Sequence, residues 1–240
     1  RPPRSTLFPY TTLFRSGMLF TLACAGVIVM GTSRTPHVVD AYRACRMPLV
    51  ITGQNIPGMP CVYHDDVNAL KDLTTLVIKR GRRRIAYIGV RETDPQAGLA
   101  RREGVEAAFV EAGRNKDELI RVEVRFNPED GYQSAKRLLT EHNDIDGIIC
   151  ATDTIATGAM RAVLDAGKAV GKDFSIVGVG DNWMNNYMET PLTTAHFYFE
   201  QCGEDAAEML LSAIGHSKKD EPFPIRQVCL EYNIIDRGSI

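Results

Sequence analysis

Short runs of apolar residues alternate along the chain with longer stretches in which apolar residues recur every three or four positions. The longer stretches predict amphipathic helices, with core-facing residues such as Leu70, Leu73 and Val77. The short runs predict buried β-strands over residues 26–30, 49–51, 85–90, 122–126, 147–151, 175–180 and 228–235. A chain that alternates strands with helices in this way is predicted to be an α/β protein with parallel sheets.

Glycine and polar residues mark the ends of these elements. Glycines that favour helix termination follow four of the predicted helices, at positions 81, 113, 167 and 215. In open parallel sheets, ligands bind beyond the carboxyl ends of the strands, so functional side chains should follow the strand runs. Four polar segments meet this condition and are expected to lie at one edge, namely residues 63–66, 91–102, 151–154 and 181–183.

Several polar residues have both a structural and a functional interpretation. Asp66 and Asp153 each precede a predicted helix, where N-capping is the more frequent role, although capping and ligand binding can coexist. Arg101 opens a predicted helix, where its charge opposes the macrodipole, and this cost favours a functional role. The basic run Lys79–Arg84 straddles a helix C-terminus, which favours a solvated helix end over a phosphate site.

The composition restricts the class of protein further. Of the 240 residues, 44% are hydrophobic and 24% charged, and the formal net charge is −2. No window approaches the roughly 20 apolar residues of a membrane-spanning helix, so we expect no membrane association. The six cysteines have neither CxxC spacing nor a histidine at ligand spacing, which predicts no metal site and reduced thiols, as in the cytoplasm. Hydrolase, metalloprotease and P-loop motifs are absent, and the sequence Gly178–Gly180 is an incomplete dinucleotide fingerprint, so we expect neither an enzyme nor a cofactor.

Residues 1–16 differ from the rest of the chain. They contain the near-repeats Thr6–Phe8 and Thr12–Phe14, three arginines and no acidic residue, without helical or strand periodicity. The segment resembles translated sequencing-adapter DNA and is interpreted as a non-native leader, a disordered basic tail being the alternative. Without it, residues 17–240 carry 25 basic and 30 acidic groups, a net charge of −5 that makes a poor nucleic-acid surface.

A series of motifs resembles, in order and spacing, the effector-binding domain of the lactose and galactose repressor (LacI/GalR) family. The motifs are Arg83–Gly89, Arg101–Gly104, Cys150–Met160, Ser175–Gly178 and Pro191–Thr194. The closing residues 233–239 are similar to the natural C-terminal end of that family, so the resemblance covers residues 26–239. Residues 63–66 and 150–154 look most like the trehalose and sucrose repressor kind.

The resemblance implies a type I periplasmic-binding-protein-like fold, with two doubly wound parallel-sheet subdomains and a sugar in the cleft between them. The chain should cross between subdomains near Gly81, within residues 195–197 and within residues 216–223. Residues 17–80 plus 197–217 would then form a partial N-subdomain, and residues 82–195 plus 225–240 the C-subdomain.

The resemblance also implies a set of effector-binding residues. Carried over residue by residue, the family's cleft positions fall on Asp66, Arg101, Thr152, Asp153 and Phe199, with His196 and Tyr198 flanking Phe199. Where the family often has a pair of acids, this chain has Gly180 before Asp181, so Asp181 is the only candidate for the usual hydroxyl acceptor there. Aspartate and arginine bond vicinal hydroxyls while an aromatic ring covers an apolar C–H face, which suits a carbohydrate or sugar phosphate.

A member of this family would be a cytoplasmic, homodimeric transcriptional repressor controlled by its sugar. A full-length member would begin with a helix-turn-helix headpiece, followed by further strands of the N-subdomain. Since neither is found in this sequence, we expect a truncated N-subdomain, operator DNA binding only through the missing headpiece, and marginal stability of the isolated chain.

Two other classes of function remain as alternatives. A periplasmic sugar-binding receptor of a transporter would share the fold and the cleft, but six cysteines without evident pairing argue against the periplasm. An α/β enzyme is the third interpretation, and no catalytic constellation supports it.

Overall fold

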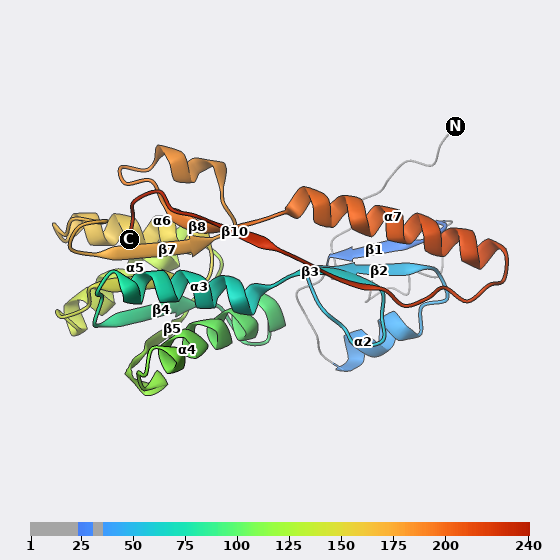
Figure 1. The fold of residues 1–240 in the computed structure, drawn as a ribbon, viewed down its shortest axis with the longest axis horizontal. Coiled ribbons are helices and arrows are strands. Elements are labelled where there is room, and N and C mark those ends of the chain that lie inside the picture. Colours follow the sequence, from blue (N-terminus) through green and yellow to red (C-terminus); the bar gives the residue numbers. More distant parts are fainter. Residues whose placement is uncertain (1–23, 31–35) are drawn as a thin grey trace.

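The computed structural model describes residues 24–30 and 36–240, which form two lobes built on separate sheets (Figure 1). The sheet of the N-lobe has the spatial order β1 (Val27–Met30), β2 (Leu49–Thr52), β3 (Cys61–His64) and β9 (Gln227–Leu230), and all its strands are parallel. The sheet of the C-lobe has the order β10 (Tyr232–Ile235), β8 (Thr193–Phe197), β7 (Ser175–Val179), β6 (Gly147–Cys150), β4 (Ile85–Gly89) and β5 (Ile120–Glu123). Only β10 is antiparallel to its neighbour within that sheet. The predicted α/β fold with parallel sheets is confirmed.

The C-lobe contains two pairs of closely packed helices. One pair is α3 (Asp66–Lys79) with α4 (Arg101–Glu111), and the other is α5 (Pro128–Glu141) with α6 (Asp153–Asp165). Glycine permits both approaches: a Cβ on Gly104 would lie 2.2 Å from the carbonyl oxygen of Val67, and one on Gly158 would lie 1.8 Å from that of Pro128. Strands β4, β6 and β7 are buried along their whole length between the helices.

Successive side chains of β2 point to opposite faces of the N-lobe sheet, and a small core lies on each face. Leu49 and Ile51 pack with Tyr42 of α2 (Pro36–Arg43) on one face of the sheet. Val50 points to the opposite face, where it joins Ala206 and other residues of α7 (Phe199–Lys218). The N-lobe sheet is therefore covered on both faces, by α2 and α7 (Figure 1).

Within residues 36–240, the chain crosses between the lobes three times, at Asp65, Tyr198 and Glu231. The expected first crossing near Gly81 is wrong, because α3 packs its Leu70, Leu73 and Val77 into the core of the C-lobe. The expected third crossing within residues 216–223 is also wrong, since β9 still pairs with β3 and only Glu231 separates it from β10. Residues 66–80 therefore belong with the C-lobe, and residues 225–230 with the N-lobe.

Other elements differ from the sequence-based expectation. The strand expected at residues 228–235 is two strands in different sheets, and the strand expected at 122–126 is β5, which begins at Ile120. Strands β3 and β8 and helix α2 were not predicted. Three shorter turns are η2 (Pro95–Ala100), η3 (Lys116–Glu118) and η4 (Trp183–Tyr187). The leader predicted at residues 1–16 lies outside the described residues.

Candidate functional site at the junction of the lobes

A buried ion pair joins the first turn of α3 to the start of α4. Asp65 caps α3 by accepting a hydrogen bond from the amide of Asn68, so the cap is Asp65 and not Asp66 as the sequence suggested. The carboxylate of Asp66 accepts a 2.6 Å hydrogen bond from Nε of Arg101, and the two residues are 5% and 9% exposed. Arg101 also donates from Nη1 to the carbonyl oxygen of Ala151, directly beyond β6. This pair therefore ties three segments together at the carboxyl end of the C-lobe sheet.

The helix of Arg101 begins earlier than the sequence indicated. The π-helical turn η2 precedes α4, and Asp94 caps that turn by accepting hydrogen bonds from the amides of Gln96 and Ala97 at 3.0 and 2.9 Å. Arg101 is the first residue of α4, as predicted, but the helical backbone continues into it from η2, so its charge does not lie at a free helix N-terminus. Its charge is balanced by Asp66 instead.

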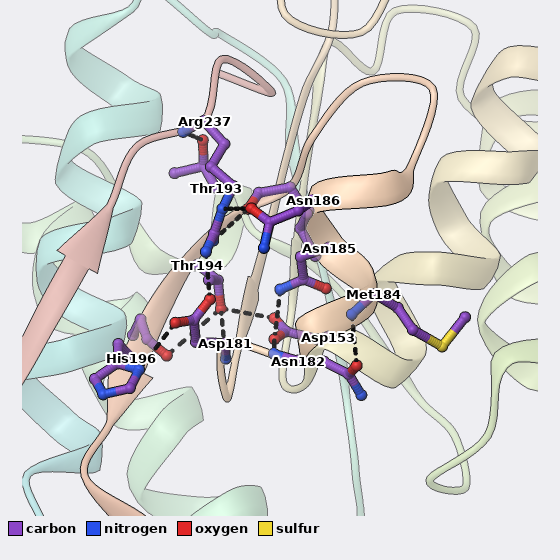
Figure 2. A network of polar contacts seen from close by, with 12 residues as sticks. Asp153, Asp181, Asn182, Met184, Asn185, Asn186, Thr193, Thr194, His196 and Arg237 are labelled. Carbon is purple, nitrogen blue, oxygen red and sulfur yellow. Dashed lines mark hydrogen bonds and ion pairs between the residues drawn. The ribbon is translucent and has the colours of Figure 1, made fainter.

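Asp153 is almost completely buried and saturated with hydrogen bonds. Its carboxylate accepts from the amide of Asn182, from Nδ2 of Asn185 and from Oγ1 of Thr194, at 2.8, 2.8 and 2.7 Å (Figure 2). Burial raises the pKa of Asp153, and these hydrogen bonds act in the opposite direction. The predicted cap of α6 is therefore corrected as well: Oγ1 of Thr152 accepts from the amide of Ile155, while Asp153 fastens the loop after β7 to β8.

Asp181 is engaged in a second polar cluster beside Asp153. It adopts a φ of +52°, following Gly180 at +127°, and this turn brings its carboxylate to the end of β8. Nδ1 of His196 lies 2.9 Å from Oδ2 of Asp181, and Nη2 of Arg237 donates to Oδ1 at 2.6 Å (Figure 2). Both carboxylate oxygens of Asp181 thus have internal partners.

Aromatic rings line the crossing between β8 and α7. His64, the last residue of β3, stacks on Phe197 with ring centroids 4.6 Å apart, and Phe199 meets His64 edge-on at 5.2 Å. The guanidinium carbon of Arg101 lies 5.4 Å from the centroid of Phe197. Phe199 itself is 58% exposed, so an apolar face remains open beside the buried ion pair.

The eight predicted site residues lie at the carboxyl end of the C-lobe sheet or at the crossing beside it. Seven of them form two clusters, and the eighth, Thr152, caps α6. Asp66, Arg101 and Phe199 are linked through Phe197, whereas Asp153 and Asp181 are linked through Thr194. His196 belongs to the second cluster and contacts the ring of Tyr198 at 4.9 Å. Their ligand-binding roles stay predictions, and the three carboxylates have internal partners already.

Three buried polar atoms near these clusters make no hydrogen bond among the described residues: Tyr87 Oη, His64 Nε2 and Asn185 Oδ1. The ring of Tyr87 extends along β4 past Gly89, where a Cβ would meet it at 2.5 Å, so its hydroxyl lies toward the carboxyl end of the strand. Burial raises the pKa of Tyr87 and lowers that of His64. His64 lies in the segment 63–66 that was predicted to lie at this edge. Tyr87 and Asn185 were not predicted, although a tyrosine inside the otherwise aliphatic run IAYIG was a usable signal.

The family of the chain follows from comparison with known proteins. A family model described as a periplasmic binding protein-like domain matches residues 74–240. The chain belongs to this family. The HTH-type transcriptional regulator RegA of Clostridium saccharobutylicum is 29% identical to this chain over 216 residues. The aligned region covers 89% of this chain and 64% of RegA. The chain thus spans less than two thirds of the length of that relative.

Solved structures share the fold of this periplasmic binding protein-like chain. A LacI family transcriptional regulator from Enterococcus faecium with bound ribose has a TM-score of 0.81 at 22% identity, covering 94% of this chain and 82% of that one. A complex of the transcriptional regulator CelR with cellobiose also has a TM-score of 0.81, at 24% identity, covering 93% of this chain and 68% of that one. All three of these proteins are described as transcriptional regulators.

Residues 24–30 and 36–240 of this periplasmic binding protein-like chain lack both a metal-binding cluster and a membrane-spanning helix. No group of three or more histidine, cysteine, aspartate or glutamate side chains is placed to hold a metal ion there. Within the same residues, no helix has the length and apolar character needed to span a membrane.

Proposed function

We propose that the chain is the sugar-sensing portion of a LacI-family transcriptional repressor. The relatives support this proposal, because they are transcriptional regulators and two of the similar structures carry ribose or cellobiose. The observation that carries it is the convergence of an arginine, several unpartnered buried polar atoms and an exposed aromatic ring where the lobes join. Such a combination matches the hydroxyl groups and the apolar C–H face of a sugar ring.

The contacts of the predicted residues indicate two kinds of role: some residues position other groups, and others contact the sugar. Asp66, Asp153 and Asp181 position other groups, since their oxygens are already occupied by Arg101, by the loop after β7 and by His196 with Arg237. The groups that meet the sugar are then Nη2 of Arg101, the hydroxyl of Tyr87, Thr152, His196 and Tyr198, with Phe199 against the ring face. Arg101 also accommodates a sugar phosphate.

The sugar acts on the whole protein by favouring one arrangement of the lobes. A ligand shifts such an equilibrium only by its differential affinity for the two states, typically about 1 to 3 kcal/mol of coupling. The three adjacent crossings at Asp65, Tyr198 and Glu231 are the segments that absorb the change. In the parent protein, a cytoplasmic homodimer, the movement releases operator DNA from a helix-turn-helix headpiece.

Calorimetric titration with mono- and disaccharides, trehalose and sucrose included, and with their 6-phosphates tests this function. We expect one class of sugar to bind saturably and Tyr87→Phe to weaken that binding about threefold to tenfold, because a single hydrogen bond to the ligand is lost. The melting temperature should be retained, since the Tyr87 hydroxyl has no partner among the described residues. Tyr132→Phe, which removes a surface hydroxyl bonded to Asp165, is the matched control. Absence of saturable binding by any sugar would overturn the proposal.

A further inference from the structure

An open cavity of about 370 Å³ lies at the opposite end of the C-lobe from the sugar site. It is formed by the segments that precede β4 and follow α3 and α4. Three of its six lining residues are arginines and one is acidic: Ile78, Gly81, Arg82, Arg83, Arg114 and Glu118. We refer to this cavity as the arginine groove.

Two arginines of the groove are held in fixed positions by neutral acceptors. Arg82 donates from Nε to the hydroxyl of Ser175 at 2.7 Å and from Nη2 to the carbonyl oxygen of Lys172 at 2.8 Å. Arg114 donates from Nη2 to the carbonyl oxygen of Arg83 at 2.6 Å, and its guanidinium carbon lies 4.4 Å from the centroid of the Phe109 ring. The neutral acceptors of Arg82 orient its guanidinium without cancelling its charge, whereas Arg114 also has an acidic partner, Glu118.

Few carboxylates offset these charges. Glu118 pairs with Arg114 at 3.3 Å, and Asp146 accepts hydrogen bonds from the backbone amides of Arg83 and Arg84. The guanidinium of Arg83 makes no ion pair or hydrogen bond among the described residues, and the residue is exposed. Three guanidinium groups therefore face two carboxylates, of which one is already engaged by backbone amides.

A solvated helix C-terminus accounts for only part of this arrangement. It explains Lys79 and Arg80, since cations are favourable at that end of α3 and Arg80 also pairs with Asp236 at 3.3 Å. It does not explain Arg82, which is anchored beside β7. Arg114 follows the C-terminus of a second helix, α4, so the ends of two helices direct arginines into the same groove. Planar guanidinium groups held at fixed positions are suited to the oxygens of phosphate and related anions.

We propose that the arginine groove binds a phosphate-class oxyanion, carried by a small phosphorylated metabolite or by free phosphate. The cavity is large enough for a small ligand. A nucleic acid is disfavoured, because residues 17–240 have a net charge of −5. The proposal is independent of the sugar site, which lies at the other end of the same sheet.

Titration of the isotopically labelled chain with inorganic phosphate, followed by amide chemical shifts at constant ionic strength, tests this site. We expect saturable shifts at Gly81, Arg83 and Arg114, and at least about tenfold weaker binding in Arg83→Gln at an unchanged melting temperature. Arg161→Gln removes the same charge from the exposed face of α6 and should bind as the parent does.

A parallel titration with a sugar 6-phosphate distinguishes the two sources of the anion. Tighter binding of the ester at the same amides assigns the groove to a metabolite, whereas equal affinity assigns it to free phosphate. Shifts that do not saturate, or equal affinity in the parent and Arg83→Gln, would overturn the proposal. Shifts confined to residues around Arg101 would place the anion in the sugar site and overturn it as well.

Discussion

Replacement of Arg101 by methionine tests whether the buried ion pair with Asp66 holds the candidate site together. The change leaves the carboxylate of Asp66, only 5% exposed, without its counter-charge and removes the donor to the carbonyl oxygen of Ala151. Breaking a buried pair by removal of one partner costs about 3 to 5 kcal/mol. For a chain of this size that corresponds to a fall in melting temperature on the order of 10 °C.

A double-mutant cycle with Asp66→Leu separates the pair from other effects. We expect Arg101→Met/Asp66→Leu to recover most of the loss, because an apolar pair of similar volume leaves no buried charge unpaired. Arg125→Met breaks an exposed pair with Asp130 and should leave the melting temperature nearly unchanged. Circular dichroism during thermal unfolding measures all four variants. If Arg101→Met melts within about 2 °C of the parent, the pair does not stabilise the site and the reasoning is refuted.

Four further outcomes are expected. Burial lowers the pKa of His64 below 6.5, although nearby Asp66 acts in the opposite direction. The stability that neutral His64 provides is therefore present above pH 6.5 and is lost as the pH falls through the folded-state pKa. His64→Phe should flatten the acid side of a plot of melting temperature against pH. Asp153→Ala should destabilise by about 3 kcal/mol in urea unfolding, because three donors lose their acceptor; a loss below about 1 kcal/mol would contradict the observed bonding. Gly158→Ala should destabilise by about 1 to 3 kcal/mol by forcing α5 and α6 apart, whereas Gly203→Ala, which meets no neighbour, should not. Trp183 is 72% exposed beside Tyr187 and offers apolar surface for the proposed homodimer. If the chain self-associates through this surface, Trp183→Ser should weaken self-association in light scattering, and an unchanged dimer would exclude this surface.

The fully buried strands were predictable from the sequence because they are uniformly apolar. Strands β4, β6 and β7 lie within a residue of the runs that predicted them. Strand β8 was missed because it contains Thr193, Thr194 and His196, which resemble loop residues. Their polarity is compensated by distant partners: Thr193 bonds Asp236, Thr194 bonds Asp153, and His196 bonds Asp181. Such pairings are fixed by the tertiary structure and leave no local pattern.

The lobe to which an element belongs could not be predicted either. Helix α3 is amphipathic, and its apolar residues would fit a sheet in either lobe. Its packing against α4 and into the core of the C-lobe assigns it to that lobe. A single unpaired residue, Glu231, separates two strands in different sheets. The positions of Asp66 and Arg101 in the site were predicted from family resemblance, but their pairing depends on the η2 turn, which the sequence did not indicate.

Co-crystallisation of the chain with the sugar that binds most tightly tests the central claim most directly. The account predicts one sugar at the junction of the lobes, with a hydroxyl bonded to Nη2 of Arg101 or the hydroxyl of Tyr87 and its apolar face on Phe199. A sugar bound elsewhere on the surface, or a junction closed by protein side chains while sugar binds in solution, would contradict it.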